Sequence, residues 1–330
     1  MSRLRQLCKT VPLMPVALFG SGCSRVQSIL DPGSIEADRT ALLAIILIVG
    51  AAVIFVVVMA FVALAALGSP HRRRWLAQPV TIFSGGVIFP IVTLSILLGY
   101  GLSLIRSDPP ASAPMRIEVK GEQWWWRVAY PDVNGQRVES ANEVRVPVGR
   151  DVRIELTTAD VIHSFWVPRL AGKVDMIPGR TNVLQFRASK PGSYRGQCAE
   201  YCGGAHALMG LRVVAMPEPE FDTWLSKESA PAAEPEGEAA QKGRELFGKN
   251  GCPACHTVTG IEAVGRMGPD LTHVAGRQAL AAERLPMSKQ NLARWIAHSD
   301  ELKPNNLMPS FAELPEEEID AIATYLSGLR

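Results

Sequence analysis

The chain has 330 residues, which is too long for one ordinary domain. Its 34 basic and 32 acidic side chains nearly balance, so the charge gives no reason to expect a nucleic-acid partner. Hydrophobic residues make up 47% of the chain, and its longest apolar runs lie in the first third. These totals indicate a multidomain protein with a membrane-embedded part.

Residues 1–22 have the features of a signal segment. Arg3, Arg5 and Lys9 precede a short apolar run, and small residues then precede Cys23. This order resembles a bacterial lipoprotein cleavage site and predicts acylation of Cys23. The alternative is an ordinary signal peptide followed by an incidental cysteine.

Two uncharged apolar runs follow, at 41–67 and 80–105. Each exceeds the roughly 20 residues that span a bilayer as a helix. The loop between them contains His71 and Arg72–Arg74, which the positive-inside rule places in the cytoplasm. Residues 23–107 are therefore predicted to form an N-terminal segment and a transmembrane hairpin in the bacterial inner membrane, with the rest of the chain on the periplasmic side.

Residues 108–227 are predicted to form one domain, of which residues 115–217 are expected to be β structure. Arg116–Tyr130 has the alternation of one aromatic-rich strand, on which Trp124–Trp126 would alternate between the two faces. Asn134–Gly135 is a strong hairpin-turn signal. Further short strands are expected at 143–148, 152–157, 183–187, 192–195 and 211–215. Short strands separated by Gly and Pro turns predict a sandwich or a barrel.

A dense group of metal-ligand residues follows at Cys198, Cys202, His206 and Met209, and His163 lies upstream. Thiolate, thioether and imidazole together are a ligand set that copper selects. Two cysteines four residues apart can bridge two metal ions. A disulfide and a zinc site are the alternatives, although zinc motifs use shorter paired spacings and leave the methionine without a role.

A second metal signature is Cys252-Pro-Ala-Cys255-His256, the attachment pattern of a c-type haem. A thioredoxin-like redox pair is the alternative, but it gives no role to His256. Met308, in a Met-Pro pair, is the expected sixth iron ligand, and a thioether opposite histidine raises the reduction potential. The competing residues are Met267, Met287, His273 and His298.

Residues 228–241 are rich in Ala, Pro and Glu and predict a flexible or semi-extended linker. The haem domain would occupy 242–330. A short amphipathic helix is expected just before the haem motif, and a final helix is expected at Pro315–Leu329.

The run Cys-Ala-Glu-Tyr-Cys-Gly-Gly-Ala-His-Ala-Leu-Met at 198–209 resembles the dinuclear copper (CuA) loop of cytochrome c oxidase subunit II. The resemblance extends from the membrane hairpin to Met216, and the C-terminal part resembles a class I cytochrome c. Together they resemble the fused, caa3-type subunit. The implied fold is a multidomain membrane protein with a two-helix transmembrane hairpin, an all-β cupredoxin domain and an all-α class I cytochrome c domain.

The resemblance also implies the role of each site residue. Cys198 and Cys202 would bridge both coppers, and each copper would bind one histidine, His163 or His206. The Met209 thioether and the Glu200 main-chain carbonyl would be weak ligands. The Glu200 side chain would face a magnesium ion at the contact with subunit I. One haem c would be attached to Cys252 and Cys255, with His256 and Met308 on its iron.

Three further segments resemble family features. Trp124 would be the residue through which electrons enter the copper site. Asp175 and Arg180 would help to hold the magnesium or a haem-propionate network, or form a simple surface ion pair. Asp160 would dock the electron donor or cap a turn. The family often has a proton-channel carboxylate early in the second membrane helix, but residues 80–105 contain no Asp or Glu.

The implied function is electron input to a terminal haem-copper oxidase. Electrons would come from a soluble or membrane-bound cytochrome c, or from a quinol–cytochrome c reductase. The partners would be subunit I, which reduces oxygen, and subunit III. This chain has only six histidines, none of them in the apolar runs, so the oxygen site must lie elsewhere. Two alternatives are the input subunit of a CuA-containing nitric oxide reductase and a free-standing membrane-anchored electron carrier or copper-delivery protein.

Overall fold

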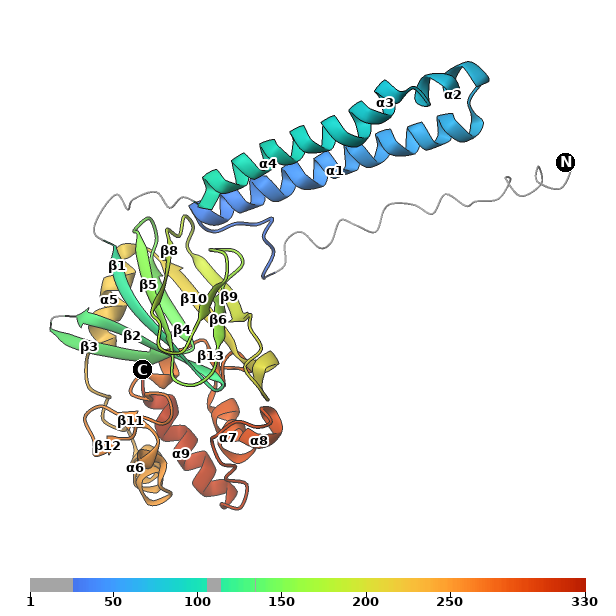
Figure 1. Cartoon of the computed structure of the whole chain (residues 1–330). Helices are drawn as coiled ribbons and strands as arrows, with labels where there is room; N and C mark the ends of the chain where they lie inside the picture. The colour runs from blue at the N-terminus through green and yellow to red at the C-terminus, as the bar shows by residue number, and fades with distance from the viewer. Residues whose placement is uncertain (1–25, 106–113, 134) are drawn as a thin grey trace, which may run out of the picture.

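The computed structural model describes residues 26–105, 114–133 and 135–330. The predicted signal segment 1–22 and the predicted acylation site Cys23 lie outside these residues. A helical hairpin projects from one end of a β domain (residues 115–216), and a helical domain (residues 238–330) lies at the opposite end (Figure 1).

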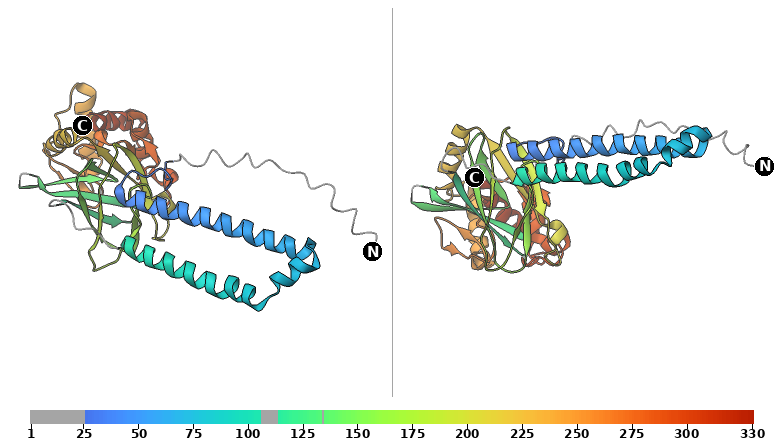
Figure 2. Two further views of the ribbon diagram at one scale, coloured as in Figure 1. Left: turned by 90° about the horizontal axis from the view of Figure 1, so that it is seen from above. Right: turned by 45° about the horizontal axis from the view of Figure 1, so that its top comes forward.

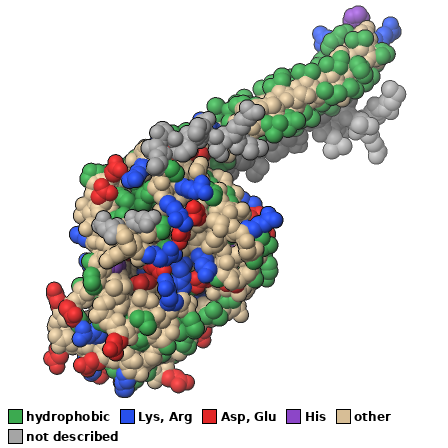
Figure 3. All heavy atoms as spheres, turned by 60° about the vertical axis from the view of Figure 1, so that its left-hand side comes forward, with side chains coloured by type: hydrophobic (Ala, Val, Ile, Leu, Met, Phe, Trp, Pro, Cys, Tyr) green, Lys and Arg blue, Asp and Glu red, His purple; other side chains and the backbone are tan. Residues whose placement is uncertain are grey.

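The hairpin consists of two long antiparallel helical arms (Figure 2). Its elements are α1 (Ile35–Leu67), α2 (Pro70–Leu76), α3 (Pro79–Phe83), the π-turn η1 (Ser84–Ile88) and α4 (Phe89–Ile105). The arms Ile35–Leu67 and Pro79–Leu104 each contain an apolar 18-residue window, with a mean hydropathy of 3.3 and 2.1, and are long enough to cross a membrane. Hydrophobic side chains cover them, whereas basic and histidine side chains gather at the far tip (Figure 3).

The first arm begins earlier than the apolar run predicts. Ser34 caps α1 by accepting a hydrogen bond from the Ala37 backbone N–H, and Glu36 and Asp38 occupy the first turn, where acidic groups favour helix formation. The base of the hairpin is attached to the β domain, because Ser34 pairs with Ala188 and the Glu36 carboxylate accepts from the Arg187 backbone N–H. The tethering fixes the β domain close to the membrane surface.

The β domain is formed by two five-stranded sheets, with strand orders β3-β2-β1-β5-β8 and β4-β10-β9-β6-β7. The strands are β1 (Met115–Glu122), β2 (Trp125–Val133), β3 (Gln136–Ala141), β4 (Glu143–Pro147), β5 (Val152–Thr158), β6 (His163–Trp166), β7 (Val174–Met176), β8 (Asn182–Phe186), β9 (Gly192–Cys198) and β10 (Gly210–Met216). Alternating side chains of both sheets form one apolar core between them, as in a β-sandwich. The sequence had not indicated β3, β6 and β7.

The prediction of a single strand over Arg116–Tyr130 is wrong. The chain reverses at Gln123 and Trp124, and β1 pairs antiparallel with β2. Trp124 therefore lies in the turn and does not share a strand face with Trp126, which is completely buried in the core. No Asn-Gly, Asp-Gly or proline turn signal marks Gln123 and Trp124, which is why the sequence pattern concealed the reversal.

The helical domain is built around α6 (Glu238–Lys249) and α9 (Glu316–Gly328), with α7 (Lys289–Ala297) and α8 (Ser299–Leu302) beside them. Two short ladders complete it. They are β11 (Thr257–Val258) with β12 (Ala263–Val264), and β13 (Ala279–Leu280) with β14 (Leu285–Pro286). The sequence had not indicated α7 and α8, whereas α6 and α9 match the predicted first and last helices.

The connector between the domains is shorter and better held than the predicted linker. Helix α5 (Glu218–Glu228) includes the first residue of the predicted linker, and α6 begins at Glu238, before the predicted end of the linker. The Ala232 backbone N–H donates to the Thr259 carbonyl at 2.8 Å, and His273 Nε2 lies 2.9 Å from the Ala230 carbonyl. The connector thus packs against the helical domain.

Helices α6 and α9 cross at Gly243, where a Cβ atom would lie 2.0 Å from the Ala321 carbonyl oxygen. We expect Gly243→Ala to destabilise the helical domain by about 1–3 kcal/mol, because the backbones would have to separate. Gly248 lies in the same helix with open space around it, so Gly248→Ala is the matched control and should be neutral or stabilising. Thermal unfolding followed by circular dichroism compares the two, and equal effects would contradict the packing argument.

Candidate copper and haem sites

Residues from the ends of two neighbouring strands and from one loop meet at a buried cluster in the β domain. His163 begins β6, Cys198 ends β9, and Cys202 lies in the following loop. Their ligand atoms lie within 4.8 Å of one another. Pairing of Phe165 with Cys198 between β6 and β9 brings the distant histidine to the cysteines. A three-residue Cys-Cys-His group of this kind can hold a metal ion.

The other predicted ligands adjoin the same cluster. His206 Nδ1 lies 3.4 Å from Cys202 Sγ, and Met209 Sδ lies 3.8 Å from it. The Glu200 carbonyl oxygen lies 3.2 Å from Cys198 Sγ. The two sulfur atoms are 3.8 Å apart, far beyond the roughly 2.05 Å of a disulfide. All six predicted copper ligands therefore come together around two free thiols.

The Cys198 and Cys202 thiols lie so close together that each changes the pKa of the other. Hydrogen bonding from Cys202, with further contacts from His163 and the Glu200 and Ser164 backbone, lowers the pKa of Cys198. The thiolate at Cys198 and burial raise the pKa of Cys202. A cation that bridges both sulfurs would displace the remaining proton, so this pair suits a metal that binds thiolates.

Asp160 fixes the orientation of His163, which is a role that the sequence did not assign to it. Its Oδ1 lies 2.8 Å from His163 Nε2, and its Oδ2 accepts from the Gln123 backbone N–H. Desolvation opposes ionisation, but the hydrogen bonds from His163, Gln123 and Val161 hold the pKa of Asp160 below its usual value. A proton kept on Nε2 leaves Nδ1 free for a metal.

We expect Asp160→Asn to weaken copper binding by about 10- to 100-fold, as loss of an outer-shell partner does in other metal sites. Titration of the metal-free protein with copper and a competing chelator measures this effect. Asp222→Asn, on an exposed part of α5, is the control. Unchanged affinity in Asp160→Asn would show that His163 does not need this partner.

The carboxylate of Glu200 lies in a small surface ion cluster. Lys173 Nζ lies 3.2 Å from an oxygen of Glu200 and 3.2 Å from an oxygen of Asp175. Both carboxylates are well exposed and therefore accessible to a cation. In the described structure, the Arg180 side chain makes no hydrogen bond or ion pair with this cluster.

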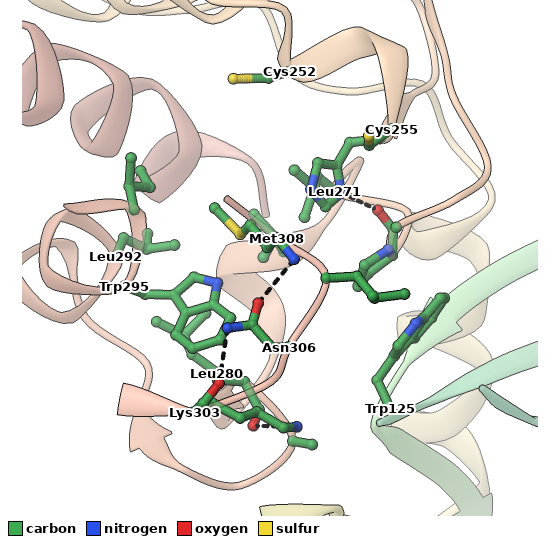
Figure 4. Close-up of a pocket in the computed structure, with 18 of the residues that line it drawn as sticks. Trp125, Cys252, Cys255, Leu271, Leu280, Leu292, Trp295, Lys303, Asn306 and Met308 are labelled. Carbon is green, nitrogen blue, oxygen red and sulfur yellow. Dashed lines mark hydrogen bonds between the residues drawn. The ribbon is translucent and has the colours of Figure 1, made fainter. Parts of the chain in front are cut away.

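The helical domain contains an apolar cavity of about 440 Å³. Cys252, Cys255, His256 and Met308 line it together with apolar side chains from α7 and the preceding segments (Figure 4). The predicted haem-attachment and iron-ligand residues thus surround one pocket. Both cysteines are free thiols.

His256 is held in the form that a haem iron requires. Its Nδ1 lies 2.8 Å from the Pro269 carbonyl, which leaves Nε2 for a metal, and burial lowers the pKa of the imidazole. A Cβ atom at Gly268 would lie 2.5 Å from His256 Cε1, so only glycine permits this approach.

Arg277 provides an independent indication of what fills the cavity. It is 8% exposed and lines the cavity, and its Nε atom has no hydrogen-bond partner in the described structure. A buried guanidinium with an unused donor is costly unless an anion is bound. A haem propionate would satisfy it, so the residues present fit a haem.

The competing iron ligands are less well placed. His273 is engaged by the connector, His298 lies beside Glu301 near the surface, and Met267 is 74% exposed. Met287 packs at the edge of the helical core. Met267 and Met308 both line the cavity, but Met308 packs against the helical core, and its backbone N–H donates to Asn306 Oδ1 at 2.8 Å.

The cavity opens toward the β domain, where Trp124 and Trp125 complete its lining. The Trp125 ring faces it from strand β2 (Figure 4). The Trp124 indole N–H donates to the Cys202 carbonyl at 3.0 Å, and the Gln123 side chain donates to the same oxygen at 2.7 Å. One turn therefore borders both predicted metal sites, and the exposure of Trp125 to the cavity was not predicted.

Comparisons with known proteins agree with this arrangement. The family described as cytochrome C oxidase subunit II, periplasmic domain, matches residues 134–216, and the family described as cytochrome c matches residues 240–330. The cytochrome c oxidase subunit 2 of Alkalihalophilus pseudofirmus is 32% identical over 97% of this chain and 96% of its own. That of Bacillus sp. PS3 is 33% identical over 65% of this chain and 62% of its own.

Among solved structures, the periplasmic domain of subunit II of cytochrome oxidase from Bradyrhizobium japonicum is 36% identical and matches with a TM-score of 0.34. The match covers 36% of this chain and 96% of that chain. The near-complete alignment with the Alkalihalophilus protein includes the hairpin, the β domain and the helical domain. The chain belongs to the cytochrome c oxidase subunit 2 family, in the form that carries a fused cytochrome c domain.

Proposed function

We propose that this chain receives electrons at a covalently attached haem c and passes them through a dinuclear copper centre to the oxygen-reducing subunit I. Family membership makes the chain a subunit of a haem-copper oxidase with an electron-input role. The observation that carries the finer proposal is the turn at Trp124, which lines the haem cavity and donates a hydrogen bond to Cys202.

The chain's own residues would hold both cofactors. Cys252 and Cys255 would hold the haem through thioether bonds, and His256 and Met308 would bind its iron. The copper ligands would be His163, Cys198, Cys202, His206, Met209 and the Glu200 carbonyl. Each centre, when bound, accepts and releases single electrons. The Glu200 carboxylate is our proposed magnesium ligand, supported by its exposure beside Asp175.

Trp124 would be the electron-entry residue of the copper site. Its indole ring borders the cavity, and its N–H donates to the loop that carries Cys202. The β domain therefore orients the receiving site, and the helical domain orients the donating site.

We propose the domain division 23–107, 108–227, 228–241 and 242–330, supported by the family matches to 134–216 and 240–330. The chain is a membrane protein with periplasmic domains, and we propose the bacterial inner membrane as its location. Subunit III and a cytochrome c or quinol–cytochrome c reductase donor are proposed partners. The arm Pro79–Leu104 contains no Asp or Glu, so any proton entrance would be formed by other residues.

Internal electron transfer tests this function directly. In the purified full-length protein with both centres loaded, a light-driven pulse of reductant should reduce the haem first. The haem absorption should then reverse while the copper absorption bleaches, in a step whose rate does not depend on protein concentration. Absence of this concentration-independent step would overturn the proposed order of the two sites.

A further inference from the structure

Lys303 is a buried cation at the contact between the two domains. It follows α8, is 3% exposed, and its Nζ donates to the Trp124 carbonyl at 2.6 Å and to the Ala281 carbonyl at 3.3 Å. Within the described part of the chain no carboxylate is paired with it. Burial lowers the pKa of Lys303 to about 7, against an opposing attraction to Cys202. Packing alone does not favour an unpaired buried ammonium.

Lys303 completes a chain of hydrogen bonds between the predicted iron and copper ligands. The Met308 backbone N–H donates to Asn306 Oδ1, and Asn306 Nδ2 donates to the Lys303 carbonyl, both at 2.8 Å (Figure 4). Lys303 Nζ then donates to the Trp124 carbonyl, and the Trp124 indole donates to the Cys202 carbonyl at 3.0 Å. The lysine supplies the step of this chain that crosses from one domain to the other.

The other oxygen that Lys303 contacts belongs to a strained turn. Ala281, Ala282 and Glu283 have φ angles of 53°, 58° and 70°, in the left-handed region that non-glycine residues disfavour. The β domain holds this turn as well, because the Gly210 backbone N–H donates to the Ala282 carbonyl at 3.2 Å. Backbone strain of this kind persists only where surrounding contacts determine it.

Two arginine–carboxylate pairs between the β domain and the helical domain support a defined docking position. Arg212 of β10 contacts Glu283 through two parallel hydrogen bonds, with Nε at 3.0 Å and the terminal nitrogen at 2.5 Å. Arg266 reaches back from the helical domain to Glu139 at 2.6 Å. Bidentate arginine–carboxylate pairs fix orientation as well as distance. Lys303 lies between these pairs, where the two predicted metal sites approach each other.

We propose that Lys303 is a positioning residue that fixes the helical domain against the electron-entry turn at Trp124. The inference rests on the proposed function, since it concerns the same transfer of one electron from the reduced haem to the oxidised copper pair, in which no bond is made or broken. In its protonated form Lys303, which is attracted to Cys202, would also favour the reduced copper centre.

The test compares Lys303→Met, Lys303→Gln and Lys289→Met in the full-length protein with both centres loaded. Methionine removes the charge and the donor, whereas glutamine removes the charge and keeps a donor. Lys289 is a partly exposed lysine paired with Asp320 and serves as the control. Copper and iron contents establish loading, redox titration gives each reduction potential, and the light-driven pulse gives the internal transfer rate.

We expect Lys303→Met to slow internal transfer by about tenfold or more, because loss of the contact with Trp124 would let the helical domain shift from the electron-entry turn, and electron transfer slows steeply with distance. Lys303→Gln should recover part of that rate, and both variants should lower the copper reduction potential. A Lys303→Met protein that transfers at the wild-type rate would overturn the inference while leaving the proposed function intact. If the wild type itself shows no internal transfer, the proposed function fails, and the inference fails with it.

Discussion

Replacing Cys202 with serine is expected to abolish the copper pair and to reduce oxidase turnover by more than about 100-fold. The loss of activity should exceed the effect of removing a residue that only contacts a metal ligand, which is up to about 100-fold. Cys202 Sγ lies within 3.8 Å of Cys198 Sγ and Met209 Sδ, and within 3.4 Å of His206 Nδ1. Cys198 and Cys202 each contact three of the other predicted ligands. A hydroxyl is a hard ligand and does not replace a bridging thiolate for copper.

Metal analysis and electron paramagnetic resonance check this expectation. The Cys202→Ser protein should contain less copper and lack the signal of an electron shared by two nuclei. Its haem content should be unchanged, because the helical domain has its own apolar core around α6 and α9. Full copper content with wild-type turnover would contradict the bridging role of Cys202.

Removal of both attachment cysteines should have an effect of similar size on electron input. In a Cys252→Ala/Cys255→Ala protein we expect no covalent haem and no electron transfer from a cytochrome donor. The cavity of about 440 Å³ would lose its contents, and the surrounding helical core would lose stability. A haem stain after denaturing electrophoresis, together with thermal unfolding of the helical domain, measures both consequences.

The two cysteine variants control for each other. The copper signal should persist in Cys252→Ala/Cys255→Ala, because the copper ligands lie on β6, on β9 and in the loop that leads to β10. Loss of copper in this variant would mean that the β domain depends on the helical domain for its fold. Haem that survives denaturation in this variant would contradict the assigned attachment residues.

The sequence predicted the copper loop well because its ligands are close along the chain. Cys198, Cys202, His206 and Met209 fall within twelve residues, so a single loop brings them together. The assignment of His163 needed the family resemblance. In the structure, the antiparallel pairing of β6 with β9 accounts for its position, and no local pattern indicates that pairing.

Contacts between distant segments could not be predicted in the same way. Lys303 and Trp124 are 179 residues apart, and neither belongs to a motif that names the other as a partner. The turn at Trp124 was concealed because a run of large side chains, without an Asn-Gly, Asp-Gly or proline turn signal, continues across it. Asp160 offered two interpretations from sequence, and neither was its contact with His163 Nε2, which is made within the short connection from β5 to β6. Tertiary structure decided these positions.

The most direct test of the account is metal analysis combined with electron paramagnetic resonance of the purified oxidised protein. The account predicts two coppers and one haem iron per chain, with hyperfine structure from one unpaired electron shared by both copper nuclei. A single copper with the hyperfine pattern of one nucleus, or zinc in its place, would contradict the dinuclear site. The proposed transfer of electrons through Trp124 to subunit I would then lose its receiving centre.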